Sequence, residues 1–194
     1  QAKHIDLQNQ IIQAQSDLIQ AHEQQHIATS AFMEQLADTL HAITYAPYSR
    51  EQVDAKLAEV IAIIEEMNST LTPDEVTEIA ESLVLCSIVT NTDKLLPILT
   101  VESRARNITG KAGEIGIMQV MPSTGAWIAR DMGYTNYDPE QLWDYRRNIR
   151  DGAYYLQAVT RDMGDEWGGV LAYNKGASGA RAFLANNDIS RSGY

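Results

Sequence analysis

Residues 116–122 read Gly-Ile-Met-Gln-Val-Met-Pro, and this stretch decides how the rest of the chain is interpreted. It is one of four short motifs that occur in a fixed order. The others are Glu102-Ser103, residues 148–156 (Asn-Ile-Arg-Asp-Gly-Ala-Tyr-Tyr-Leu) and residues 172–176 (Ala-Tyr-Asn-Lys-Gly). Each motif alone is a weak signal, so the prediction rests on the order and spacing of all four.

The segments before these motifs carry start signals for helices. Ser49 and Gln52 form a capping box that predicts a helix to about residue 67. Thr72, followed by proline at the first helical position and by Glu75, predicts a second helix to about residue 89. A third helix is expected from residue 91 to Glu102, with Pro97 bending it or moving its start downstream.

Three further helical patterns cover roughly residues 119–132, 145–163 and 168–186. No segment alternates between apolar and polar residues over several strands. We therefore expect an all-α domain with at most a small hairpin. The predicted boundaries are residues 1–70 for a helical N-terminal segment and residues 71–194 for the domain that holds the motifs.

The N-terminal segment has no proline or glycine between residues 5 and 43, and its apolar residues recur at seven-residue steps. This pattern predicts a long amphipathic helix that serves as a tether, a stalk for a partner or a second copy, or a lid. Because the chain begins at Gln1, we expect that a signal peptide, anchor or tag was removed. No run approaches the roughly 18 apolar residues of a membrane span.

The net charge of −11 is concentrated in the first 90 residues, because residues 91–194 carry twelve basic and twelve acidic side chains. Nucleic-acid binding is not expected, since it requires a basic stripe. The single cysteine, Cys86, lies in an apolar run and is expected to be buried.

The four motifs together resemble the soluble lytic transglycosylases, whose catalytic domain is related to goose-type lysozyme. The family pattern reads E-S, then G-L-M-Q-x-M-P-x-T, then N-I-x-x-G-x-x-Y-L, then A-Y-N-x-G. The resemblance covers about residues 75–194 and implies a lysozyme-like domain that acts on peptidoglycan. Four features depart from the pattern. Ala105 replaces a usual aromatic residue, and the spacing from Glu102 to Gly116 is one residue shorter than usual. Thr109 or Gly110 replaces a serine of that loop, and only Tyr194 is available for a tyrosine in a later family helix.

Glu102 is the expected catalytic residue. A general acid needs a pKa raised toward neutrality, and the apolar helix before Glu102 favours this by partial burial. The resemblance implies that this Glu protonates the bond between N-acetylmuramic acid and N-acetylglucosamine while the substrate's acetamide stabilises the cationic centre. The same Glu then takes a proton from the 6-hydroxyl, which closes to a 1,6-anhydro end without water.

The resemblance also implies a set of substrate-binding residues. Tyr173 matches a tyrosine that reaches toward the catalytic Glu, and the amide of Gln119 offers a donor and an acceptor to sugar groups. Gly116 is expected to let the loop backbone pass close to the sugar. The predicted substrate-binding residues are Ser103, Gly116, Met118, Gln119, Tyr173 and Asn174.

Two other functions on the same fold stay open at the level of sequence. A hydrolytic muramidase would need a carboxylate such as Asp138 or Glu114 to position water, because glycosidases that hydrolyse usually pair two carboxylates. A scaffold protein would bind glycan without cutting it. The substrate of either enzyme places the protein outside the cytoplasm, in a Gram-negative periplasm or in a phage particle.

His22-Glu23-Gln24-Gln25-His26 has the H-E-x-x-H spacing that places two imidazoles on one helix face for zinc. Zinc also needs a third protein ligand, and no histidine follows within a few residues. The surrounding helix is rich in Gln and too polar for a dry metalloprotease pocket. We therefore expect a solvated helix face here, with no metal and no cofactor.

Overall fold

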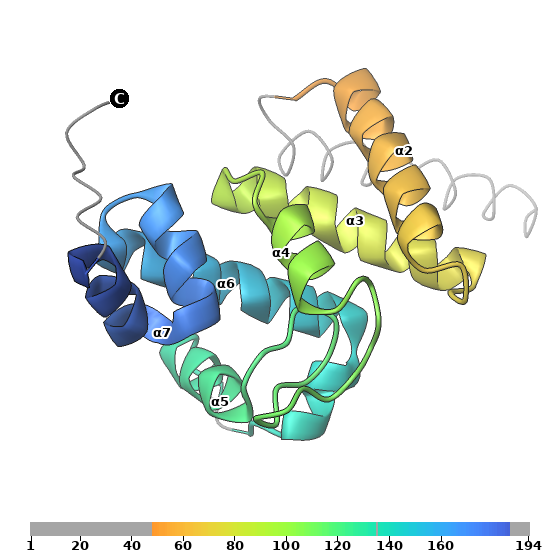
Figure 1. Ribbon diagram of the computed structural model, residues 1–194. Helices are drawn as coiled ribbons and strands as arrows, with labels where there is room; N and C mark the ends of the chain where they lie inside the picture. Colours follow the sequence, from red (N-terminus) through yellow and green to blue (C-terminus); the bar gives the residue numbers. More distant parts are fainter. Residues whose placement is uncertain (1–47, 135, 187–194) are drawn as a thin grey trace, which may run out of the picture. The chain divides into compact units, whose positions relative to one another are not determined.

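The computed structural model of the chain describes residues 48–134 and 136–186 (Figure 1). Residues Tyr48–Tyr194 form one compact unit. The helices of the described ranges are α2 (Arg50–Met67), α3 (Pro73–Thr90), α4 (Leu95–Glu102), α5 (Pro122–Asp131), the short 3-10 helix η1 (Pro139–Trp143), α6 (Tyr145–Met163) and α7 (Glu166–Asn186). The prediction of a mainly helical fold is confirmed.

Both predicted capping boxes are present. Ser49 Oγ accepts from the Gln52 N–H at 3.2 Å, and Gln52 Oε1 accepts from the Ser49 N–H at 2.8 Å. The Thr72 and Glu75 pair repeats this geometry, with Glu75 Oε2 accepting from the Thr72 N–H at 2.8 Å. These side chains satisfy backbone donors that the first turn of a helix leaves unpaired, so α2 and α3 begin where the sequence predicts.

Helix α6 is the central element of the unit and packs against α3, α5, α7 and η1, while α2 packs against α3 (Figure 1). The approach of α6 and α7 depends on Gly169. A Cβ at that position would lie 2.8 Å from the Thr160 Cα, closer than real Cβ contacts. The largest fully buried side chains come from α2 to α6, η1 and the loop after α4: Ile64, Ile79, Leu83, Leu95, Leu99, Ile117, Met118, Ile128, Leu142, Asn148, Ile149 and Leu156.

The loop between α4 and α5 contains what remains of the expected hairpin. Ile115 forms isolated antiparallel bridges with Thr109 and with Val120, and the described residues contain no longer strand. Gln119, next to the second bridge, has a φ of 52°, which is uncommon for a residue with a side chain. The loop therefore folds back on itself between the helices that carry the other motifs.

Several boundaries differ from the sequence predictions. Because α2 packs on α3, the compact unit begins at Tyr48 rather than after residue 70. Helix α4 begins at Leu95, since Pro97 fits the first turn of a helix but not its interior. Helix α7 is interrupted at Gly176, where φ is 70° and ψ is 156°. The predicted helix over residues 5–43 lies outside the described residues.

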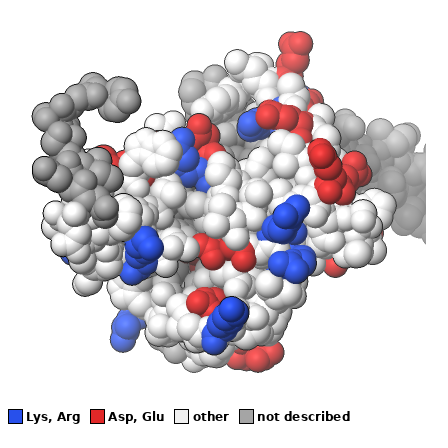
Figure 2. Space-filling view, viewed as in Figure 1, with Lys and Arg blue, Asp and Glu red and all other residues white. Residues whose placement is uncertain are grey.

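Cys86 is partly buried, and burial raises the pKa of its thiol to about 11. No described helix combines the length and the apolar character that crossing a membrane requires. On the face drawn in Figure 2, basic and acidic side chains are interspersed, and neither sign forms a continuous stripe.

Candidate active site

Glu102 is the last residue of α4, and its carboxyl group is half-buried. The helix before it anchors in the core through Leu95, Ile98 and Leu99, which are 0–6% exposed. Burial is the main cause of a raised pKa at Glu102, and the negative charge of Glu114 raises it further. A side-chain hydrogen bond with Asn174 opposes these effects and lowers the pKa. The carboxyl group thus has the environment of a general acid.

Ser103 fastens the end of this helix to the neighbouring loop. Its Oγ donates to the Ile117 carbonyl at 2.6 Å, and the side chain is almost completely buried. The next two residues, Arg104 and Ala105, have positive φ values of 54° and 55°. Such conformations cost energy for residues with a Cβ and persist where surrounding contacts impose them. The chain therefore turns sharply after Glu102 and fixes the carboxyl at the helix end.

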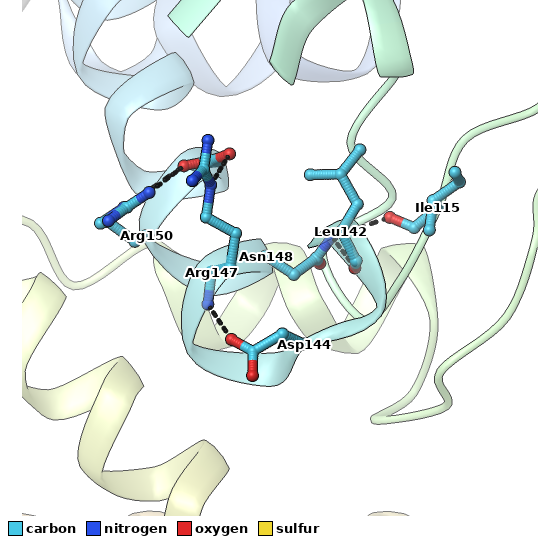
Figure 3. A network of polar contacts seen from close by, with 7 residues as sticks. Ile115, Leu142, Asp144, Arg147, Asn148 and Arg150 are labelled. Atoms are coloured by element: carbon cyan, nitrogen blue, oxygen red, sulfur yellow. Dashed lines mark hydrogen bonds and ion pairs between the residues drawn. The ribbon is translucent and has the colours of Figure 1, made fainter. Parts of the chain in front are cut away.

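Asn148 on α6 holds the loop of residues 116–122 in place (Figure 3). Its Oδ1 accepts from the Met118 N–H at 2.7 Å, and its Nδ2 donates to the carbonyls of Ile115 and Leu142, both at 2.9 Å. The side chain is 1% exposed, so all three bonds are shielded from water. An amide is the side chain that can accept from an N–H and donate to two carbonyls at once.

The same α6 turn carries a buried ion pair. Asp151 is completely buried, and Arg147 Nε donates to its Oδ2 at 2.7 Å, with Arg150 at 3.3 Å from Oδ1 (Figure 3). The negative charge of Asp151 and burial both raise the pKa of Tyr137, burial being the larger cause. This buried pair lies within one turn of Asn148 on α6.

Position 116 requires glycine because the Asn148 side chain lies against it. Its φ is 84°, and a Cβ at this position would lie 2.6 Å from the Leu142 carbonyl oxygen and even closer to the Asn148 amide. Any side chain would therefore push the loop away from α6. In the structure, the Gly116 backbone packs closely against Asn148 and Leu142, whereas the sequence predicted a close approach to the sugar.

Tyr173 on α7 reaches across to the loop. Its hydroxyl donates to the Met118 carbonyl at 2.9 Å, and its ring lies 5.3 Å from the ring of Tyr155. Burial raises the pKa of Tyr173, and the negative charge of Glu102 adds to this effect. Gly152 on α6 makes the approach possible, because a Cβ there would lie 2.9 Å from both the Tyr173 hydroxyl and Met118 Cβ.

Gln119 and Glu114 meet beside Gly110. The Gln119 amide donates to the carbonyls of Ile108 at 2.9 Å and Gly116 at 2.6 Å. A Cβ at Gly110 would clash with Gln119 Oε1 and Glu114 Oε2, so both oxygens lie over this glycine. Glu114 Oε2 also accepts from a loop N–H at 2.9 Å. Two acceptor oxygens are therefore held over Gly110, and the charge of Glu114 acts on Glu102.

The predicted site residues divide into three groups. A side-chain hydrogen bond joins Glu102 to Asn174, and the charge of Glu102 acts on Tyr173. Gln119 is partly buried and donates to loop carbonyls. Ser103, Gly116 and Met118 are buried, and in this conformation they contact other parts of the protein rather than an open surface. Substrate binding by these residues stays a prediction.

Three residues with structural roles in the site were not among the predicted catalytic or substrate-binding residues. Asn148 and Gly152 stand inside a matched motif, which was a signal that they matter, although the pattern does not reveal their partners. Glu114 gave a weaker signal, as one of two carboxylates that could position water. The other, Asp138, caps η1 by accepting from the Glu140 N–H at 3.0 Å.

Among the described residues, no group of three or more His, Cys, Asp or Glu side chains is arranged to hold a metal ion. The H-E-x-x-H segment and Tyr194 lie outside these residues. Ala105, which replaces an aromatic residue of the family pattern, is completely buried, and its carbonyl accepts from Asn68 Nδ2 at 2.8 Å. A larger side chain would have to displace this packing.

The fold and the site together define a lysozyme-like helical domain. The chain matches the Transglycosylase SLT domain family over residues 90–191, more than half of its length, and belongs to that family. A search of curated proteins finds no match.

Among solved structures, the chain is similar to an inactive Glu-to-Gln mutant of the lytic transglycosylase Slt from Pseudomonas aeruginosa, with a TM-score of 0.51 and 22% identity. The match covers 71% of this chain and 25% of that chain, so this chain spans about a quarter of that protein's length. At this identity the likeness shows a shared fold.

Proposed function

We propose that the protein is a peptidoglycan lytic transglycosylase that cleaves the β-1,4 bond between N-acetylmuramic acid and N-acetylglucosamine. The observation that carries the proposal is the environment of Glu102, which is half-buried at a helix end, with a raised pKa, beside Asn174 and Tyr173. Membership in the transglycosylase family supports it, as does the related Slt, whose inactive form differs by one Glu-to-Gln change.

In the first step, protonated Glu102 donates its proton to the glycosidic oxygen. The bond from C1 of the muramyl sugar to that oxygen breaks, and the N-acetylglucosamine side leaves as an alcohol. The acetamide of the muramyl sugar stabilises the electron-poor C1. Because the substrate supplies this group, a second protein carboxylate is not required.

In the second step, Glu102 is a carboxylate and takes the proton of the muramyl 6-hydroxyl. The oxygen attacks C1 and forms the 1,6-anhydro ring, which returns Glu102 to its protonated state without consuming water. Asn174 favours the charged form of Glu102, and burial favours the neutral form. A carboxyl balanced between the two forms suits a residue that is acid and then base.

Tyr173 and Ser103 are proposed as positioning residues. Tyr173 links α7 to the Met118 carbonyl, and Ser103 links the end of α4 to the Ile117 carbonyl. Both bonds converge on one short stretch of the loop. They hold the helix end that carries Glu102 and the helix that carries Asn174 at a fixed separation.

Digestion of purified peptidoglycan tests the proposed function. Wild-type protein is expected to clear a suspension of cell walls and release fragments that lack one water by mass spectrometry. Glu102→Gln keeps the shape of the side chain but removes its acid, so it should clear nothing. A matched variant, Glu140→Gln on the exposed surface of η1, should behave as wild type.

A hydrolytic muramidase is the second candidate, because Glu114 is close enough for its charge to act on Glu102. In that reaction Glu114 would position a water molecule for attack on C1, and the products would carry reducing ends. Products with reducing ends from wild type, and their loss in Glu114→Gln, would favour hydrolysis. A glycan-binding scaffold would instead leave wild type and Glu102→Gln equally inert.

Either enzymatic activity has a substrate outside the cytoplasm, and we propose that the protein acts there, in a periplasm or as part of a phage particle. Its proposed partner is the peptidoglycan glycan strand.

A further inference from the structure

Trp167 lies in the first turn of α7 and is 78% exposed. Its backbone is nevertheless tightly held. The Asp165 carboxylate accepts from the Gly168 N–H at 2.6 Å, and Gly169 packs against Thr160 of α6. The indole is therefore exposed on a fixed helical turn. A ligand that binds there does not have to order a loop first, which would cost free energy.

Side-chain contacts link α4 to α7 at two levels. At their starts, Thr92 Oγ1 donates to Glu166 Oε1 at 2.9 Å, and Lys94 Nζ lies 3.5 Å from Glu166 Oε2. Eight residues further along each helix, Glu102 meets the Asn174 side chain. The start of α7 is thus linked to the start of α4, and the middle of α7 is linked to the end of α4.

Trp167 belongs to the face of α7 that points toward the candidate site. It precedes Asn174 by seven residues, which is two helical turns, so both side chains project from one face about 10 Å apart along the axis.

These observations fit a polymeric sugar better than a small ligand. A glycan strand continues on both sides of the bond that is cut, so the rings next to the cleaved one must lie on the surface beside Glu102. A pyranose ring presents an apolar C–H face that stacks on a flat indole, while its hydroxyls stay in water at the rim. Large exposed apolar side chains beside a polar site are typical of such contacts.

We propose that Trp167 forms a sugar-stacking ledge that binds a pyranose ring of the glycan strand beyond the ring held at Glu102. This inference rests on the proposed function, because it assigns the path of the same substrate. The ledge determines how firmly long strands are held and has no part in the proton transfers. Its removal therefore affects the binding of long strands more than the rate of bond cleavage.

The chain offers a matched control for Trp167. Trp127 on α5 is 36% exposed, but its ring lies 5.9 Å from the ring of Tyr154 and so has a partner within the protein. Trp167→Phe and Trp127→Phe remove one indole each and keep an aromatic ring. Trp167→Ala removes the stacking surface altogether, and because the residue is exposed the variant is expected to fold.

The test measures binding of N-acetylglucosamine–N-acetylmuramic acid oligosaccharides of increasing length to the inactive Glu102→Gln protein, by calorimetry and tryptophan fluorescence. Long oligosaccharides should shift the fluorescence, and Trp167→Phe in this background should abolish most of that shift while Trp127→Phe retains it. Trp167→Ala should weaken binding of long oligosaccharides roughly tenfold, the loss usual for an aromatic anchor. Binding of the shortest oligosaccharides should change little.

Equal affinity of the Trp167→Ala and Trp127→Ala variants for long oligosaccharides would overturn the proposed ledge. A loss of affinity in Trp167→Ala that is the same for oligosaccharides of all lengths would also overturn it. Failure of the proposed function gives a different result. In that case wild type releases no product from peptidoglycan, although binding that depends on Trp167 persists. In the active protein, the ledge predicts a raised KM for long strands in Trp167→Ala, with kcat close to that of wild type.

Discussion

Glu102 is subject to two opposing influences from neighbouring side chains, and each predicts a shift in the pH profile. Glu102 must be protonated to donate, so activity falls as the pH rises through its pKa. Glu114→Gln removes a negative charge that raises this pKa, so activity should be lost at a lower pH. Asn174→Ala removes a hydrogen bond that lowers it, so activity should persist to a higher pH.

The measurement is kcat/KM against pH, which reports ionisations of the free enzyme. Glu140→Gln is the control for the loss of one acidic side chain at the surface. Shifts of Glu114→Gln and Asn174→Ala in the same direction would contradict the assignment of their effects to Glu102.

Glu102→Gln should also change stability. The pKa of Glu102 is raised in the folded protein. When the pH exceeds that pKa, the charged carboxylate therefore lowers the free energy of unfolding. Below about pH 4, near the pKa of an unfolded glutamate, both states are protonated and the penalty disappears. The variant should have a higher Tm than wild type at pH 7, with the difference shrinking toward pH 4. An equal or lower Tm at pH 7 would show that burial does not dominate at this carboxyl.

At the scale of single residues, part of the site could be predicted from the sequence. The apolar helix before Glu102 indicates a raised pKa because periodicity places the residue beside the core. The role of Gly116 could not be predicted, because the clash that requires glycine involves Asn148, thirty-two residues away. Likewise, the burial of Met118 depends on contacts with α6 and α7 that periodicity within the loop does not encode.

At the scale of elements, Asn148 connects α6 to the loop, and its replacement should loosen both. Asn148→Asp can still accept from the Met118 N–H, but it cannot donate to the carbonyls of Ile115 and Leu142. Because leaving a buried polar group unsatisfied costs about 1–3 kcal/mol, the free energy of unfolding should fall by about 2 kcal/mol or more. Urea denaturation measures this loss, and Asn186→Asp at the exposed end of α7 should show almost none.

Gly152 sets the distance between α6 and α7 at the site. Gly152→Ala adds a methyl group 2.9 Å from the Tyr173 hydroxyl, so it should break the bond to Met118 and lower kcat. Gly179→Ala is the control, because its Cβ would meet only Lys175 Cβ at 3.2 Å. Alanine is a better helix former by about 1 kcal/mol, so this control should be neutral or stabilising. Full activity of Gly152→Ala would mean that the Tyr173 bond does not position the site.

Helix starts were predictable to the residue for α2 and α3, because capping boxes are local and need no tertiary contact. The start of α7 was placed two residues too late, since Glu166 is held there by Thr92 and Lys94 from a distant segment. The hairpin reduces to isolated bridges because the loop is held mainly by side chains of α6 and α7 rather than by strand pairing.

At the scale of the whole molecule, the family match begins at residue 90, but the compact unit begins at Tyr48. Helices α2 and α3 therefore belong to the body that supports the site. Tyr145 on α6 donates to Glu75 on α3 at 3.1 Å, which joins the two parts. The predicted domain of residues 71–194 included α3 but not α2, because the motifs that indicate the family lie after both helices.

Cleavage of intact peptidoglycan in water enriched in the heavy isotope of oxygen tests most directly whether Glu102 acts alone as acid and base. A transglycosylase closes the ring with the sugar's own 6-hydroxyl, so the new muramyl ends should lack one water and contain no heavy oxygen by mass spectrometry. Glu102→Gln should release no such ends, and Glu140→Gln should match wild type. Heavy oxygen in the new ends, or full activity of Glu102→Gln, would contradict the proposed mechanism.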